Sequence, residues 1–208
     1  MRPRTMRPVL VRALAAGAVA ATALAAAPTA ALAGHHDDAA LAEPPEPRHD
    51  PTGLYAGLGV GLTAYVVAPA YGGGPAGNLH LGWRISEIIG LQVTLGGLWL
   101  IGHELPGTAL ASTVDGALRL FVRTSGRWDP YLEGGAGLWA ARTGDPVKIY
   151  RALGFFAGIG HEVHISNFTI GMHARYVGVA MAKSTDPADD VRGHGALIEG
   201  ELYSAVRF

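Results

Sequence analysis

The stretch that decides the fold is Leu202-Tyr203-Ser204-Ala205-Val206-Arg207-Phe208, at the end of the sequence. Along it, side chains that suit lipid alternate with polar side chains, which is the period of a β-strand. The sequence stops on the aromatic Phe208. A soluble sheet rarely leaves so apolar a strand at its edge. A transmembrane β-barrel needs one, because its last strand closes the ring and turns one face to lipid.

The same alternation recurs along the chain from Gly53 to Phe208, in eight segments. Each has about ten residues, the length that a tilted strand needs to cross the hydrocarbon layer. In the first segment Leu54 and Leu58 share one face, while Gly57 and Gly59 share the other. Every segment has one face compatible with lipid. The sequence therefore predicts an all-β protein, an eight-stranded antiparallel up-and-down transmembrane β-barrel.

The links between these segments alternate in length, as short periplasmic turns and longer outer loops do in membrane barrels. Compact links lie near Ser86, at Thr124–Asp129 and at Ser166–Asn167. Longer links, rich in Gly, Pro or charge, lie near Pro69–Pro75, Trp99–Ala111, Ala141–Lys148 and Ala180–Arg192. This arrangement places outward aromatic residues at both rims: Trp83, Phe168 and Phe208 at the periplasmic rim, Phe155 and Tyr176 at the outer rim.

The terminal Phe208 resembles the C-terminal assembly signal of bacterial outer-membrane β-barrel proteins. With the strand pattern, residues 53–208 resemble the small eight-stranded outer-membrane family that includes the OmpA transmembrane domain, OmpX and OmpW. The resemblance implies an outer-membrane location and a monomer. It also implies contact with outer-membrane lipid and lipopolysaccharide, and with the barrel-assembly machinery. The OmpW likeness implies an alternative to a structural or surface-interaction role, namely a narrow channel or a transporter of small or hydrophobic solutes.

The beginning of the sequence has the pattern of a secretory signal peptide over residues 1–33. Arg2, Arg4, Arg7 and Arg12 precede an Ala-rich apolar stretch. Ala31-Leu32-Ala33 gives an A-x-A cleavage site, which would make Gly34 the first mature residue. Residues 34–52 are rich in Pro, Glu and Asp, and we expect a disordered periplasmic lead-in before the barrel domain at 53–208.

Composition excludes some partners and suits a barrel. Without residues 1–33 the chain has 12 basic and 17 acidic residues, so nucleic acid is an improbable partner. The chain has no Cys, and therefore no disulfide framework or lipidated thiol. Its 30 Gly residues weaken helices but suit strands whose inner face must stay slim.

Charged residues fall on the face opposite the lipid-compatible one. We expect nine of them to form a salt-bridged network in a narrow lumen, because unpaired charges there would be costly: Arg84, Asp115, Arg119, Glu133, Glu162, Arg175, Glu199, Glu201 and Arg207. Side chains just fill the interior of an eight-stranded barrel. The network then holds the strands of the wall in register, and we expect no catalysis, cofactor or metal site. The alternative function of these charges is a gated polar path through the lumen.

Two motifs suggest enzymes. Gly135, Gly137 and Ala140 fit the form G-x-G-x-x-A of a dinucleotide loop, but no helix pattern follows, and spaced glycines on an inner strand face explain it better. The run His164-Ile165-Ser166-Asn167 resembles the H-x-S-N element of outer-membrane lipid A deacylases, which implies a base and a nucleophile in His164 and Ser166. Ser-Asn is also a common turn sequence, and we interpret Ser166-Asn167 as a turn.

Two further features suggest metal ions. If the mature chain starts at Gly34, His35 is its second residue and His36 its third. A histidine in third place after a free amine is an arrangement that binds Cu(II) or Ni(II). The acidic loop with Asp186, Asp189 and Asp190 is able to meet divalent cations that bridge lipopolysaccharide. We interpret both segments as polar and solvated, and assign neither as a site. At the level of fold, the alternative is a soluble barrel that binds a ligand, with its apolar face turned inward.

Overall fold

The computed structural model describes residues 52–67, 70–103, 109–122, 127–143, 148–184 and 194–208. Several predicted features lie outside these ranges. They are the signal peptide, the lead-in up to residue 51, His35 and His36, and the acidic residues Asp186, Asp189 and Asp190.

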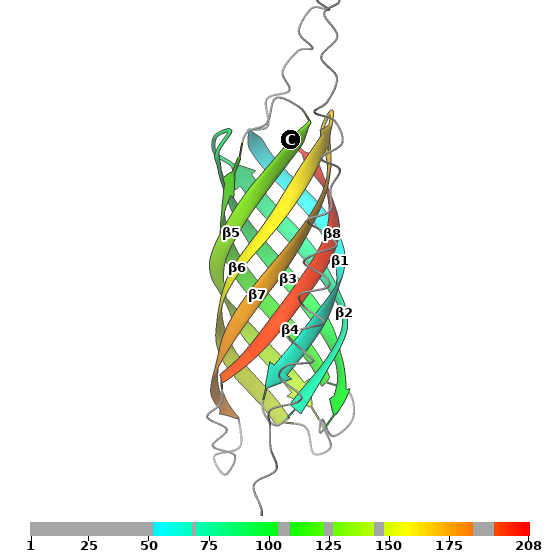
Figure 1. The fold of residues 1–208 in the computed structure, drawn as a ribbon, viewed down its shortest axis with the longest axis vertical. Helices are drawn as coiled ribbons and strands as arrows, with labels where there is room; N and C mark the ends of the chain where they lie inside the picture. The colour runs from blue at the N-terminus through cyan, green and yellow to red at the C-terminus, as the bar shows by residue number, and fades with distance from the viewer. Residues whose placement is uncertain (1–51, 68–69, 104–108, 123–126, 144–147, 185–193) are drawn as a thin grey trace, which may run out of the picture. The chain divides into compact units, whose positions relative to one another are not determined.

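Eight antiparallel strands form a closed barrel in which each strand pairs with the next in sequence and β8 pairs with β1 (Figure 1). The strands are β1 (Gly53–Val67), β2 (Ala70–Arg84), β3 (Ile89–His103), β4 (Ala109–Phe121), β5 (Trp128–Thr143), β6 (Lys148–Ile165), β7 (Phe168–Ser184) and β8 (His194–Arg207). The predicted eight-stranded antiparallel up-and-down barrel is confirmed. Closure gives every strand two hydrogen-bonded neighbours, so no backbone edge is left open to lipid.

No helix in the described part of the chain is long and apolar enough to cross a membrane.

The strands contain 13 to 18 residues, so the predicted length of about ten is wrong. The difference lies at the end of the barrel away from Gly53 and Phe208, which we call the far end; the other is the terminal end. The predicted loop Pro69–Pro75 belongs almost wholly to β2, which pairs with β1 as far as Ala70 and Val67. The glycines of this segment form part of the wall. At Gly72 a side chain would meet the inward Tyr65 hydroxyl, so only glycine leaves room for it.

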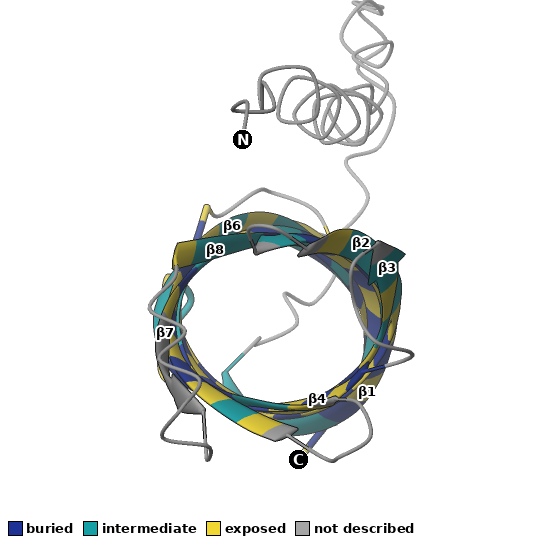
Figure 2. Cartoon of the chain, turned by 90° about the horizontal axis from the view of Figure 1, so that it is seen from below, coloured by how far each residue is buried: buried dark blue, intermediate teal, exposed yellow. Residues whose placement is uncertain are grey.

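The wall separates an apolar outer face from a buried inner face, and Figure 2 shows exposed and buried residues alternating along the strands. Leu58 and Leu62 point outward and are 67% and 71% exposed, whereas charged residues such as Arg119 and Glu133 are buried inside. A soluble barrel with an apolar lumen would show the reverse arrangement. The soluble alternative is therefore excluded, because this much exposed apolar surface requires lipid.

The outward aromatic residues follow the prediction at one end only. Trp83, Phe168 and Phe208 lie at or beside strand ends at the terminal end. Phe155 and Tyr176 lie in the middle of β6 and β7, not at the outer rim as predicted, because the strands continue beyond them.

The lumen lining changes character along the barrel. Towards the terminal end the inward side chains are mostly charged or polar, and we call this region the charged half. Towards the far end they form an apolar cluster, which we call the apolar half: Tyr65, Ala76, Leu98, Ala111, Ala117, Trp139, Ala152, Phe156, Val177, Val179 and Leu197. The sequence analysis did not anticipate the apolar half, because it assigned much of that length of chain to loops.

Candidate functional site: the charged half of the lumen

Arg119 on β4 is the centre of the charged half, and its side chain has 0% exposed surface. Its guanidinium donates from Nε to Glu133 Oε2 at 3.1 Å and from Nη1 to Glu162 Oε1 at 3.0 Å. It also donates to the Tyr203 hydroxyl at 3.2 Å, and that hydroxyl donates to Glu162 Oε1 at 2.6 Å. The Arg119 guanidinium carbon lies 4.4 Å from the centre of the Tyr131 ring, a cation–π distance. One side chain thus joins β4 to β5, β6 and β8.

Arg175 adds β7 to this network. Its Nε donates to Glu133 Oε1, so both carboxylate oxygens of Glu133 accept from arginine. The Arg175 guanidinium also lies over the Phe156 ring, 4.9 Å from its centre, at the boundary with the apolar half. The inward glycine Gly158 leaves room for these groups, since a Cβ there would lie 3.0 Å from Arg175 Cγ.

A second group of charges lies nearer the terminal end. Arg84 Nη1 donates to Asp129 Oδ2 at 2.7 Å, and its guanidinium covers the Phe121 ring at 3.8 Å. His164 Nε2 lies 3.1 Å from the same Asp129 oxygen, and Arg207 Nη2 lies 3.1 Å from His164 Nδ1. The sequence analysis assigned Asp129 to a link. The alternation Asp129, Tyr131, Glu133 on β5 is the signal that could have placed it inside.

The remaining predicted charges have different partners. In the described ranges Asp115, Glu199 and Glu201 form no ion pair with arginine. Asn78 Nδ2 donates to Glu199 Oε1 at 3.0 Å and also to Glu201, while His80 Nε2 contacts Glu201. Asp115 Oδ1 is buried with no hydrogen-bond partner. The pairing expected among the predicted charges thus joins Arg119, Arg175, Glu133 and Glu162, and leaves these three acids to neutral or histidine neighbours.

Three histidines lie among these acids, and the sequence analysis assigned them no part in the lumen network: His80, His164 and His173. Each sits at an inward position of its strand, so the period of two was sufficient to find them. The buried described charges comprise four arginines, Arg84, Arg119, Arg175 and Arg207, and six acids, Asp115, Asp129, Glu133, Glu162, Glu199 and Glu201. Among these buried described residues, and before any histidine is counted, the acids outnumber the arginines by two.

Neither enzyme-like motif forms a site. His164 points into the lumen, whereas Ser166 is an exposed turn residue with φ 55°, and the hydrogen bonds that the structure describes do not join them. A base and nucleophile pair is therefore not assembled. Gly135 and Gly137 lie inside β5, which continues as a strand to Thr143. A Cβ at Gly137 would overlap the Asp115 carboxylate, so the glycine serves close packing.

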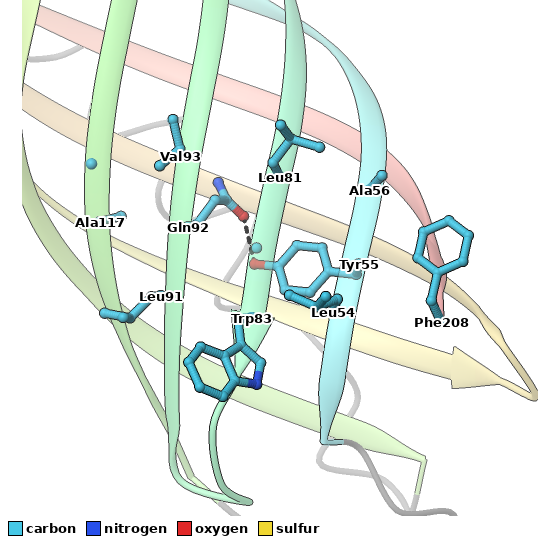
Figure 3. Close-up of a pocket in the computed structure, with 12 residues that line it drawn as sticks. Leu54, Tyr55, Ala56, Leu81, Trp83, Leu91, Gln92, Val93, Ala117 and Phe208 are labelled. Carbon is cyan, nitrogen blue, oxygen red and sulfur yellow. Dashed lines mark hydrogen bonds between the residues drawn. The ribbon is translucent and has the colours of Figure 1, made fainter.

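A shallow hollow of about 720 Å³ lies in the wall of β1, β2 and β3 beside Phe208 (Figure 3). Leu54, Trp83 and Leu91, which line it, are exposed on the outer face. On the inner side of the same wall the Tyr55 hydroxyl donates to Gln92 Oε1 at 2.9 Å. Outward residues of the lipid-facing surface and the inward Tyr55, Gln92 and Ala117 thus line the hollow together.

Comparison with known families agrees with this geometry. Residues 13–199 match the family model described as outer membrane protein beta-barrel domain. The chain belongs to this outer-membrane β-barrel family. Membership places the protein in the outer membrane, as predicted, and the apolar outer wall is the surface that faces lipid.

Solved structures share the fold of this outer-membrane barrel. Neisserial surface protein A has 15% sequence identity and a TM-score of 0.61, covering 76% of this chain and 98% of its own. Ail of Yersinia pestis has 15% identity and a TM-score of 0.51, covering 76% and 99%. OprG of Pseudomonas aeruginosa has 10% identity and a TM-score of 0.51, covering 77% and 97%. No curated protein sequence matches the chain significantly.

Proposed function

We propose that this outer-membrane barrel has a structural and surface-interaction role, in which the charged half of the lumen locks the wall and conducts nothing. The observation that carries the proposal is Arg119, fully buried and bonded to side chains of three other strands. Breaking a buried ion pair by removing one partner costs about 3–5 kcal/mol. A polar path through this region would have to separate several such contacts together, so the network favours a permanent plug. The proposal includes no catalysis.

The outer surface supplies the proposed partners. Short turns lie on the periplasmic side of membrane barrels, so the terminal end faces the periplasm and the far end faces outward. Arg142 on β5 and Arg151 on β6 are exposed towards the far end, on adjacent strands. Their positions suit contact with the phosphates of lipopolysaccharide. At the opposite end, the exposed Phe208 is available to the barrel-assembly machinery. The proposal includes a monomer, and closure is consistent with it because no strand edge is left for pairing with a second copy.

Conductance tests the plug. Purified protein in planar bilayers should give currents at noise level, with Arg119→Ala equally silent because neighbouring side chains still fill the narrow lumen. A gel mobility shift between unboiled and boiled samples confirms that each protein is folded. Reproducible unitary currents from the folded wild-type protein would overturn the proposal and assign a channel instead.

The leader also belongs to the proposal. Export removes residues 1–33 and leaves Gly34 as the first residue, followed by the lead-in. N-terminal sequencing of protein extracted from outer membranes tests this. A start anywhere other than Gly34 would contradict the assignment and remove the copper or nickel motif at His35 and His36.

A second candidate function is the binding of a hydrophobic solute, and the apolar half favours it. Its lining includes Leu98, Val179 and Leu197, and it lies between the charged half and the outside. Trp139 is the inward tryptophan of the described strands, whereas Trp83, Trp99 and Trp128 are exposed. A solute in the apolar half should therefore change the Trp139 fluorescence. Titration with a hydrophobic hydrocarbon probe should alter wild-type emission but not that of Trp139→Phe; equal responses would place the probe on the outer wall.

A further inference from the structure

Two histidines and two glutamates meet in the middle of the lumen, between the Arg119 network and the apolar half. His80 lies on β2, His173 on β7, and Glu199 and Glu201 lie two residues apart on β8. One ligand atom from each of His173, Glu199 and Glu201 lies within 4.8 Å of the others. His80 Nε2 contacts the Glu201 carboxylate, and the two imidazole centres are 6.3 Å apart. Three side chains with metal-binding donors thus converge from two strands, and His80 on β2 contacts one of them.

The His173 ring has one buried nitrogen that forms no hydrogen bond. Its side chain is buried, and its Nε2 has no hydrogen-bond partner. That nitrogen points at the cluster, since it lies 3.4 Å from Glu201 Oε2. A buried polar atom without a partner costs free energy comparable to a lost hydrogen bond. A cation between the imidazole and the carboxylates would satisfy it.

Charge balance points the same way. Glu199 and Glu201 form no ion pair with arginine in the described strands, and the buried charges leave an excess of two negative charges. Asn78 and the two histidines are their partners, and these contacts supply no permanent positive charge. One divalent cation at this point would cancel the excess.

The wall is shaped to hold these groups. Gly59 on β1 lies directly beneath them, and a Cβ there would overlap the Glu201 carboxylate and lie 2.9 Å from His80 Nε2. The outer ring nitrogens are also occupied. His80 Nδ1 lies 3.2 Å from Thr94 Oγ1, and His173 Nδ1 lies 3.5 Å from the Tyr131 hydroxyl. The Gln92 amide nitrogen also lies 3.1 Å from His80 Nδ1, so that ring nitrogen accepts, and the Nε2–H of His80 donates to Glu201. His80 therefore holds the Glu201 carboxylate in place, as neighbouring groups hold the ligands of protein metal sites.

We propose that His173, Glu199 and Glu201 bind one divalent transition-metal ion of the zinc class inside the lumen, with His80 holding the Glu201 carboxylate in place. One imidazole nitrogen and two carboxylate oxygens form a set of three donors suited to zinc, with bonds of about 2.0–2.2 Å, and a water would complete the tetrahedral site. The ion links β7 and β8, strands that Arg175 and Arg119 tie to the rest of the wall by other contacts. This site goes beyond the proposed plug, which would stand without it.

Metal content tests the site first. Full-length mature protein, extracted from outer membranes in mild detergent, should contain about one equivalent of zinc by elemental mass spectrometry after gel filtration. The zinc content of His173→Gln should be at least tenfold lower than that of the wild-type protein. The matched control is His161→Gln, because His161 lies on the outer wall and stacks on Trp128, 5.3 Å between ring centres. Retention by the control and loss by His173→Gln supports the site.

If His173→Gln fails to fold, reloading the wild-type protein with zinc provides a second test of the site. The protein is unfolded in urea with a chelator, refolded into detergent, and divided into samples with Zn²⁺ or with chelator. Zinc should raise the thermal midpoint by several degrees, since a ligand that binds only the folded state stabilises it. Wild-type protein with below about a tenth of an equivalent of metal and the same midpoint in both samples would overturn the site. Conductance is measured separately, so this failure leaves the plug untouched.

Discussion

The two halves of the lumen lie inside the same eight strands and behind the same apolar outer wall, yet they are filled by different interactions. In the charged half, side chains such as Arg119 and Glu133 meet through directional hydrogen bonds. In the apolar half, side chains such as Trp139, Val179 and Leu197 meet by packing alone. Directional contacts fix which strand faces which, whereas packing requires only volume. The charged half therefore defines the arrangement of the wall, and the apolar half fills the remaining space.

The largest effect should follow from breaking the charged half at Arg119. Arg119→Ala leaves Glu162 without an arginine partner and Glu133 with Arg175 alone, and should lower the free energy of unfolding by about 3–5 kcal/mol. Urea titration in detergent micelles, followed by gel mobility, measures it. Arg151→Ala on the outer wall is the control and should change stability by less than about 0.5 kcal/mol. Equal effects of the two substitutions would show that the network contributes nothing.

A smaller effect should follow from filling the space beneath the charged half. Gly59→Ala puts a methyl group where the Glu201 carboxylate lies, and should cost about 2–3 kcal/mol by overpacking. Gly77→Ala is the matched control, because a Cβ there meets nothing within 4 Å. Thermal melts of both variants measure the difference. If both variants melted at the wild-type temperature, the missing side chain at Gly59 would have no role in packing.

The apolar half should respond to lost volume. Val179→Ala removes two buried carbons, and should cost about 2 kcal/mol from lost burial and the small cavity. The control Val114→Ala removes the same atoms from the exposed outer wall and leaves no cavity, so its cost in detergent should be smaller. Urea titration of both proteins provides the comparison. A larger loss for Val114→Ala would mean that the apolar half is loosely packed.

The smallest effect on stability should come from a residue in neither half. Phe208 is 80% exposed, so Phe208→Ser should change the free energy of unfolding by less than about 0.5 kcal/mol. If the residue is an assembly signal, the amount in outer-membrane fractions should nevertheless fall severalfold. Leu54→Ser, at an exposed lipid-facing position nearby, controls for lost apolar surface. Wild-type levels of Phe208→Ser in the outer membrane would remove the assignment.

The same contrast between halves explains where prediction from sequence succeeded. Around Arg119, Leu118 and Leu120 face lipid and the charge faces inward, so a period of two is visible in the sequence. Around Val177 and Val179 the inner face is apolar as well, so the contrast disappears. Glycines near Tyr65 add to this, because they have the composition of a loop while forming the wall. The predicted strands consequently stopped short at the far end.

The sequence by itself determined the number of strands, their antiparallel order, the face that meets lipid and the inward placement of the nine predicted charges, because alternation between two environments is written along each strand. Only the tertiary structure decided which charges meet. Arg119 reaches Glu162 and Tyr203 across the lumen, and His80 and His173 approach Glu201 from different strands. These contacts depend on register and tilt around a closed ring, and a linear pattern of faces does not contain that information.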